Sequence, residues 1–335
     1  MAETRNLILE IGTEEIPARF CAPALEQLKA NAVKAFQEAR LDYGVVDVFG
    51  TPRRLVLYVR DLALVQRDVQ MEVKGPPRKA AFDAAGNPTI AARKFAEGQG
   101  VAVEELEVRP DEKGGEYLYA RKLIKGESVS KVLPPLLSGL VTSIHWPKAM
   151  RWADREIRYA RPIKWILALL GDSRVPFDVD GIETVDTTRG HRVLGPAEPI
   201  PVKDADDYFA KVSSGWVMVD QGIRKQVIWQ QVTTEAARLG GHVRRDEALL
   251  EELTWLVEQP TAFTGSFDPA FLEVPAEVLV TTMKEHQRYF PVYKSEDSDE
   301  LLPYFIGIRN GGEEHLDIVR AGNEKVLAAR LADAR

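Results

Sequence analysis

The opening of the chain mixes helix and strand signals in an order that excludes most regular folds. Short apolar stretches predict strands at 7–11, 45–49 and 54–62, and an apolar stripe along 23–40 predicts a helix after the first strand. The order β-α-β-β breaks the alternation of parallel α/β folds, and the turn at 12–17 is not a glycine-rich phosphate loop. We therefore predict an α+β fold with mixed sheets, packed helices and several subdomains, and not a Rossmann fold.

Clusters of glycine and proline divide the chain into three predicted regions. Residues 1–65 with 150–195 form an N-terminal α+β domain, and residues 66–149 form an α+β subdomain inserted into it. Residues 196–335 form a second α+β region. Its last helix, predicted over Asn323–Ala334, reaches the end of the chain without a capping signal. We therefore expect a fragment of a longer protein, in which this region leads into a further C-terminal part.

Local patterns inside the inserted subdomain give two specific predictions. The Gly-Pro-Pro sequence at 75–77 predicts a break in regular structure. Residues 103–108 and 116–123 predict strands, with turn-forming residues at 111–115 between them.

The charge balance limits the partners that the chain can have. Its 335 residues include 44 basic and 51 acidic side chains, for a formal net charge of -7. Any RNA contact must then come from a local basic patch, and DNA is not an expected partner. The single cysteine, Cys21, excludes an intrachain disulfide and fits a cytoplasmic location. No apolar run approaches the roughly 20 residues of a membrane helix, so no membrane partner is expected.

Common catalytic motifs are absent from the sequence. It contains no dinucleotide-binding glycine motif, no P-loop, no His-Glu-x-x-His and no Gly-x-Ser-x-Gly. None of the five histidines has a partner at metal-ligand spacing, and one cysteine cannot build a zinc finger. We predict no catalytic residue, no metal and no cofactor on this chain.

The stretch 145–165 is the strongest candidate for nucleic-acid binding, because cations alternate with aromatic rings in it. Cations can meet phosphates while flat rings stack on unpaired bases. The alternative is that the rings belong to a core and the arginines to a solvated face. The candidates in this stretch are Lys148, Arg151, Trp152, Arg155, Arg158 and Arg161.

Three shorter motifs add further candidates for RNA contact. Guanidinium groups suit phosphate and carboxylate partners, so each motif is equally compatible with ordinary ion pairs. The residues are Arg53 and Arg54 after a turn, then Arg189, His191 and Arg192 around a glycine, and finally His286, Gln287 and Arg288.

The segment 283–290 concentrates an acid, an imidazole, an amide, a guanidinium and two aromatic rings. At helical spacing His286 shares a face with Leu279 and Met283. We therefore expect His286 to face the edge of a core rather than to act in catalysis, and Arg288 to help fix a helix-to-strand corner.

Several motifs together resemble one known family, the β subunit of bacterial heterotetrameric glycyl-tRNA synthetase. Each motif is weak alone, but their number and order along nearly the whole chain are specific. They are Glu10–Pro17, Thr51–Leu55, Pro147–Trp152, Arg161–Ile163, Gly190–Arg192, His286–Phe290 and Gly322–Ala334.

The resemblance implies a division of labour between two subunits. In this family the α subunit has the class II catalytic fold and binds glycine, ATP and Mg²⁺, so neither that fold nor those ligands are expected here. The β subunit recognises glycine tRNA and supports an α2β2 assembly. It continues into an HD-like domain and a helical anticodon-binding region, both of which would follow residue 335.

Two alternatives to a non-catalytic, tRNA-recognising role remain. One is an editing-like hydrolytic module that acts on mischarged tRNA through His191 or His286. It is suggested by a fold-level similarity to the editing-type module of the phenylalanyl enzyme. The other is a purely structural module that docks the α subunit.

Overall fold

The computed structural model describes residues 3–333, and its internal contacts divide the chain into two compact units. The inserted unit is built from Ala63–Val132 together with Gln37–Asp42 and Glu3. The main unit contains the other described residues, so the N-terminal domain and the region after residue 196 form one body. The inserted unit ends at Val132 rather than at 149. The reason is that Leu137 and Val141, further along the same helix, are buried in the main unit.

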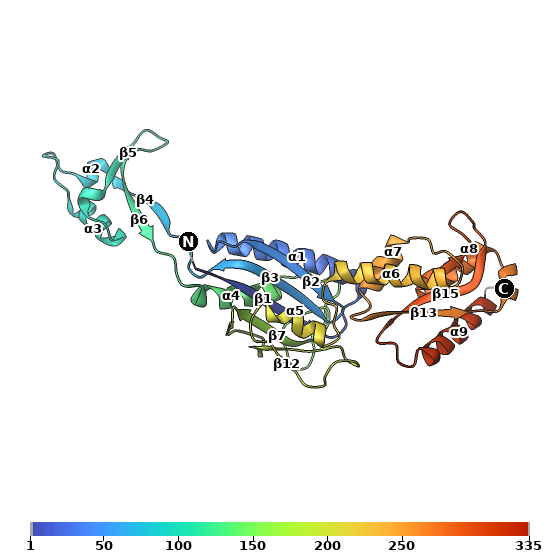
Figure 1. Ribbon diagram of the computed structural model, residues 1–335. Coiled ribbons are helices and arrows are strands. Elements are labelled where there is room, and N and C mark those ends of the chain that lie inside the picture. The colour runs from blue at the N-terminus through green and yellow to red at the C-terminus, as the bar shows by residue number, and fades with distance from the viewer. Residues whose placement is uncertain (1–2, 334–335) are drawn as a thin grey trace. The chain divides into compact units, whose positions relative to one another are not determined.

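A mixed seven-stranded sheet forms one half of the main unit (Figure 1). Its strand order is β2-β3-β1-β7-β10-β9, with β8 paired to β7. β1 and β7 run antiparallel, while β10 and β7 run parallel, which confirms the predicted α+β class. The strands are β1 Thr4–Thr13, β2 Val45–Thr51, β3 Arg54–Ala63, β7 Ile163–Leu170, β8 Ser173–Arg174, β9 Asp178–Val179 and β10 Ile182–Val185.

Helices cover both faces of this sheet because side chains alternate between its faces along each strand. Ile8 and Leu167 pack against α5 (Asp207–Ser214), which buries Tyr208 and Val212. The longer helix α1 (Ala18–Glu38) lies on the opposite side of the strands (Figure 1) and buries Leu28 among other residues. The remaining elements of this half are α4 Val129–Thr142 and the short pair β11 Thr187–Thr188 and β12 Ile200–Pro201.

The other half of the main unit is a three-stranded antiparallel sheet between helices. Its order is β13-β15-β14, so β15 is the central strand and β13 is an edge strand. α6 and α7 bury one face around Ile306, and α9 buries the other around Phe305. The elements are α6 Gln221–Arg238, α7 Glu247–Thr254, β13 Pro260–Ser266, the 3-10 turn Pro269–Glu273, α8 Ala276–Thr281, the π turn Thr282–His286, β14 Phe290–Tyr293, β15 Leu301–Asn310 and α9 Leu316–Asp333.

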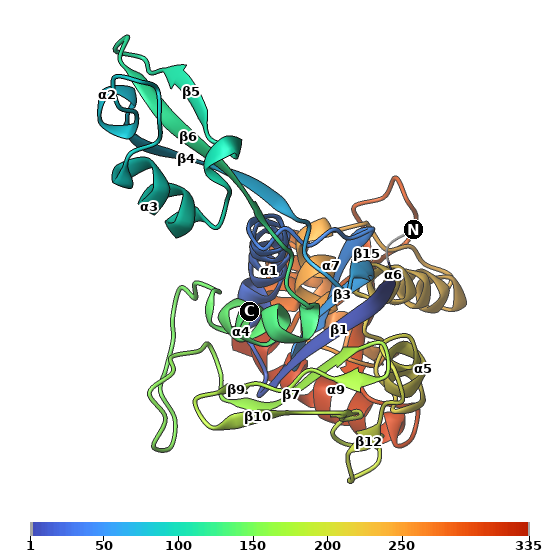
Figure 2. The ribbon, with the colours of Figure 1, turned by 90° about the vertical axis from the view of Figure 1, so that its left-hand side faces the viewer.

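The inserted unit is a small two-layer module in which helices lie on one face of a sheet ordered β4-β6-β5 (Figure 2). The helices cover Leu118 and Ala120 of the central strand. The other face presents two tyrosines, and one of them, Tyr117, lies 3.6 Å beneath the Lys74 ammonium. Its elements are β4 Val69–Pro77, α2 Arg78–Ala81, α3 Ile90–Gln99, the 3-10 turn Val103–Glu105, β5 Glu107–Pro110 and β6 Glu116–Ile124.

One predicted break is confirmed, and two sequence-based boundaries are wrong. The Gly-Pro-Pro at 75–77 interrupts the ladder after Lys74 and ends β4 at Pro77, which confirms the predicted break. The predicted strand at 103–108 begins as a 3-10 turn, and pairing starts only at Glu107. The last helix begins at Leu316, ahead of Asn323, and its predicted end at Ala334 lies outside the described residues.

Candidate functional site

The basic stretch forms an irregular loop between α4 and β7 in the main unit (Figure 2). Its start is bonded to α1: His145 N–H donates to Gln27 Oε1 at 2.8 Å, and Gln27 Nε2 donates to the His145 carbonyl at 3.1 Å. Met150 and Tyr159 pair through their backbones, and the Tyr159 ring packs on Trp146 with centroids 4.9 Å apart. The loop therefore has a defined backbone although it contains no helix or strand.

The cations of this loop differ in how far they are already paired. Lys148 and Arg158 are exposed, and neither has a partner within residues 3–333. Arg151 is exposed and lies 3.4 Å from Glu156. Arg155 and Arg161 are half-buried and donate to the carbonyls of Asp180 and Ala160. The half-buried Trp152 belongs to the same loop.

Arg54 lies in a buried ion network instead of on the surface. Its side chain is 0% exposed, with Nη1 3.1 Å from Glu10 Oε2 and Nε 3.0 Å from Glu258 Oε1. Thr188 Oγ1 donates to Glu10 at 2.7 Å, and Tyr208 and Trp165 donate to the same carboxylate. We therefore remove Arg54 from the candidates for RNA contact, because no RNA can reach a side chain enclosed in this way.

The charges in this network stabilise one another against the cost of burial. Burial acts to raise the pKa of Glu258, but Arg54 and Arg53 outweigh it and hold that pKa below its usual range. Arg53 is 12% exposed and donates to the Gly190 carbonyl at 3.2 Å. The network joins β1, β3 and the segment before β13, so it holds the two halves of the main unit together.

His191 is buried and serves as a hydrogen-bonding centre for its own loop. Nδ1 accepts from the backbone N–H groups of Val193 and Leu194 at 3.2 and 3.1 Å. Nε2 therefore carries the proton and donates to Asn310 Oδ1 at 2.9 Å. Gly190 allows this turn, because a Cβ there would lie 2.8 Å from the Gly215 carbonyl oxygen. Both ring nitrogens are occupied, so neither RNA nor an acyl ester can use this imidazole.

The two arginines beside His191 remain at the surface. The Arg189 guanidinium lies over the Trp165 ring at 5.7 Å. Arg192 donates to Glu14 at 2.6 Å, and Lys164 lies 3.4 Å from the same carboxyl group. Burial acts to raise the pKa of Glu14, but hydrogen bonds from Lys164 and Arg192 hold it below its usual value. This surface cluster is therefore largely neutralised within the chain.

The segment 283–290 does not fold as a continuous α-helix, and the prediction for His286 is wrong. Thr282–His286 form a π turn, which adds a residue to the turn and rotates the side chains that follow. Met283 is buried, whereas His286 is exposed and Gln287 is half-buried. Arg288, with φ of 57°, donates to Glu252 on α7 at 2.6 Å. The segment is a helix-to-strand corner, with its imidazole in solvent.

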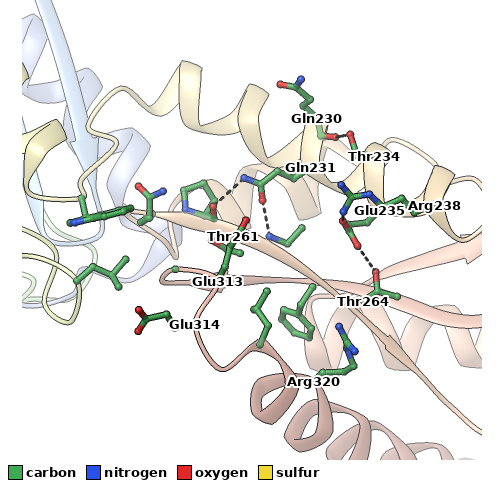
Figure 3. Close-up of a pocket in the computed structure, with 18 of the residues that line it drawn as sticks. Gln230, Gln231, Thr234, Glu235, Arg238, Thr261, Thr264, Glu313, Glu314 and Arg320 are labelled. Atoms are coloured by element: carbon green, nitrogen blue, oxygen red, sulfur yellow. Dashed lines mark hydrogen bonds and ion pairs between the residues drawn. The ribbon is translucent and has the colours of Figure 1, made fainter.

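A groove of about 1050 Å³ lies in the second half of the main unit (Figure 3). α6 and the start of α9 form its sides, and β13 forms its floor. Val193, Leu194 and Trp216 also line the groove, and the Trp216 side chain is half-exposed on a backbone with φ of 63°. Glu313 and Glu314 also line the groove, and their carboxylates have no partner within the described part of the chain.

Sequence reasoning missed Trp216 and the two glutamates, because no motif surrounds them. It also missed Glu10 and Glu258, although an acid inside an apolar run, as in Leu7–Ile11, is a usable signal for a buried partner. Among residues 3–333 no group of His, Cys, Asp and Glu is placed to hold a metal ion. No helix in that range is long and apolar enough to cross a membrane.

Known proteins resemble this chain along almost its whole length. It matches the family described as glycyl-tRNA synthetase beta subunit over residues 7–335. It is 52% identical to the glycine–tRNA ligase beta subunit of Moorella thermoacetica and 49% identical to that of Desulforamulus reducens, each over 98% of this chain and 47% of the relative. The Bacillus subtilis protein of the same name is 46% identical over 98% of this chain and 48% of its own length. The chain thus spans about half the length of the curated relatives it matches, and it belongs to the glycyl-tRNA synthetase β subunit family.

Proposed function

We propose that this chain is a non-catalytic, tRNA-recognising part of a glycyl-tRNA synthetase, and that the loop 145–162 is its RNA contact. Under this proposal the chain works with an α subunit in an α2β2 assembly. Glycine, ATP and Mg²⁺ are then bound by that α subunit, which attaches glycine to its tRNA in the cytoplasm. The names of the relatives, each a glycine–tRNA ligase beta subunit, support this assignment.

One observation carries the choice of the loop as the RNA contact. Lys148 and Arg158 are exposed cations without a partner among the described residues, and Arg151 has only a solvent-exposed one. When a free lysine or arginine neutralises a phosphate, the counterions condensed on the RNA backbone are released. This release supplies a large share of the affinity of proteins for RNA. Trp152 adds a flat ring in the same loop, on which an unpaired base can stack.

Three of the other candidate arginines offer less to a phosphate, whereas Arg189 is exposed over the Trp165 ring and has no carboxylate partner in the described chain. Arg53 is mostly enclosed and is bonded to Glu258 and to the Gly190 carbonyl. Arg192 and Arg288 are exposed but already paired with Glu14 and Glu252. Because an RNA phosphate would have to displace a carboxylate from each of them, we expect these arginines to contribute less than the loop.

Charge reversal in the loop tests the proposal. The triple variant Lys148→Glu, Arg151→Glu and Arg158→Glu should bind glycine tRNA at least about tenfold more weakly in a filter-binding assay. The slope of log affinity against log salt should fall by about 0.7–0.9 for each phosphate contact that is lost.

The matched control reverses three other exposed cations of the main unit: Lys29→Glu, Lys203→Glu and Lys325→Glu. It makes the same change in net charge away from the loop and should lower affinity much less. Equal losses in the two triple variants would show that tRNA responds to net charge only, and the loop would then not be the contact.

The editing alternative loses one of its two candidate residues. His191 has both ring nitrogens occupied inside the chain. His286 is exposed, but it has no hydrogen-bonded carboxylate or nucleophile among the described residues. No specific observation favours hydrolysis over RNA binding, so we do not propose it.

A further inference from the structure

The groove in Figure 3 follows the outer edge of a β-strand. β13 pairs with β15 on one side and has no strand on the other in the described chain. α6 and α9 pack against the two faces of the same sheet, and both line the groove. The free edge of β13 therefore lies recessed between two helices, at the floor of a cavity of about 1050 Å³.

Hydrogen bonds show which backbone groups of β13 face the groove. The Ala262 N–H donates to Gln231 Oε1 at 2.7 Å, and Gln231 Nε2 donates to the Pro260 carbonyl at 3.2 Å (Figure 3). The Ser266 N–H donates to Glu324 at 2.8 Å. Even-numbered residues thus direct their backbone away from β15, as alternation in an antiparallel ladder requires.

The middle of this edge is open. By the same alternation, the Ala262 carbonyl and the Thr264 N–H and carbonyl point into the groove, and no hydrogen bond to another described residue satisfies them. Two side chains cap the flanking positions, Gln231 on one side and Glu324 on the other. Side chains that cap an edge in this way commonly protect it from pairing with unwanted strands.

We propose that this groove binds an extended segment of the partner α subunit, which adds a strand along the free edge of β13. The inference rests on the proposed function, because it takes the α subunit as the partner. Gln231 acts as a placeholder, because its amide bonds the Ala262 N–H and the Pro260 carbonyl in the free chain. The backbone of the incoming segment would replace the amide at these two groups. Strand addition to a sheet edge is a common way of binding peptides, in which backbone bonds give affinity and alternate side chains give specificity.

The chemistry of the groove favours a polypeptide over RNA. A row of backbone donors and acceptors is complementary to another peptide backbone, which RNA does not have. The charged lining consists of a paired Glu235 and Arg238, an exposed Arg320, and Glu313 and Glu314, whose carboxylates have no partner in the described chain. The lining is therefore net negative, which disfavours phosphates and favours an arginine or lysine of the incoming segment. Trp216 and the 76% exposed Val193 offer an apolar surface in the groove.

A second copy of this chain fits the groove less well. Its own β13 edge would be recessed between α6 and α9 in the same way. Two recessed edges cannot approach to hydrogen-bonding distance, whereas a single extended segment can enter between the helices. Self-association is therefore treated as an outcome that the experiment can detect.

Hydrogen exchange provides the direct test. We expect that adding purified α subunit to this chain slows amide exchange in the peptide covering 260–266, with the Thr264 amide protected most. The chain alone at the same total concentration controls for self-association. Absence of binding, or binding without protection of this peptide, would overturn the proposal, as would equal protection in the chain alone.

Two substitutions of Thr264 separate the contribution of its backbone N–H to α-subunit binding from that of its side chain. Thr264→Pro removes the outward N–H and leaves the ladder to β15 intact, so it should weaken α-subunit binding by about tenfold or more. Thr264→Val removes only the hydroxyl, which bonds Glu235, and should bind α like the wild type. A thermal melt of each variant checks that the fold is retained, and equal affinities would contradict strand addition.

Gln231→Ala gives a result that a purely structural role would not produce. Removing the placeholder leaves the Ala262 N–H open, so affinity for the α subunit should increase. The control Gln226→Ala, which alters an exposed amide of α6 outside the groove, should change nothing. Weaker binding by the Gln231 variant would count against the placeholder role.

The acidic part of the lining is tested with Glu313→Lys and Glu314→Lys, which should weaken α binding by about tenfold. The control pair Glu296→Lys and Asp297→Lys reverses two exposed acids outside the groove. If the groove variants lose tRNA but keep the α subunit, the groove is an RNA site and the proposal fails. Loss of tRNA only in the loop variants would leave the function proposal in place whatever happens at the groove.

Discussion

Two arginine-rich segments look alike in the sequence and have opposite environments in the molecule. Arg54 follows a turn beside Arg53 and is fully enclosed with Glu10 and Glu258. Arg158 belongs to an equally basic segment and is exposed without a partner in the described chain. The difference shows that the local motif does not decide the role of an arginine. An arginine is structural where distant strands place carboxylates around it, and it is available for binding where they do not.

The cost of burial explains why the two environments are distinct. A guanidinium can be removed from water only where charges and acceptors replace its hydration. At Arg54 these come from β1, from the segment before β13 and from the Arg189 carbonyl. No such set converges on the loop 145–162, so Lys148 and Arg158 stay in solvent and keep their charge available.

The largest expected effect comes from replacing one arginine in each environment. Arg54→Met leaves the buried Glu10 without an ion pair and Glu258 with Arg53 alone, so the main unit should lose about 3–5 kcal/mol of unfolding free energy. Arg158→Met should change it by no more than about 0.5 kcal/mol. Urea denaturation followed by tryptophan fluorescence measures both, and similar losses would remove the distinction between the two segments.

The histidines provide a smaller version of the same comparison. His191→Ala leaves the backbone N–H groups of Val193 and Leu194 without their acceptor and removes one of three donors to Asn310 Oδ1, which should cost about 1–3 kcal/mol. His286→Ala alters an exposed ring and should be nearly neutral. If the His286 variant were the less stable one, the assignment of its ring to solvent would be wrong.

Lowering the pH should give the smallest of these effects on the free energy of unfolding. The pKa of Glu258 lies below its usual value in the folded chain, so the unfolded chain takes up this proton first as the pH falls. Stability should be fully present above the unfolded value of about 4.3 and should decline as the pH drops below it. Glu258→Gln should flatten this part of the profile, and an unchanged slope would mean that other carboxylates dominate acid unfolding.

Local patterns predicted the α+β class and most of the elements. The apolar alternation of Leu55, Leu57 and Val59 fits a strand whose residues are buried, and β3 follows it. The boundaries failed where tertiary context decides. Residues 103–105 form a 3-10 turn because pairing with β6 starts only at Glu107, and the position of a partner strand is not visible in the local sequence.

For the candidate site too, local features were predicted from the sequence and features that depend on tertiary contacts were not. The sequence indicated the basic loop and all five of its lysine and arginine residues, because their clustering is local. It placed His286 at the edge of a core, because a regular period of 3.6 residues was assumed where a π turn occurs. It gave no sign of the β13 groove, whose walls come from residues as far apart as Val193 and Arg320.

What the sequence determined by itself is the family, the fold class and a basic, aromatic segment, because ordered motifs and periodicity are properties of neighbouring residues. Only the tertiary structure decided which arginines are framework, which histidine is enclosed and which strand edge stays open. Burial and pairing depend on groups that are distant along the chain. Arg54 needs Glu258, more than two hundred residues away, before its charge can leave water.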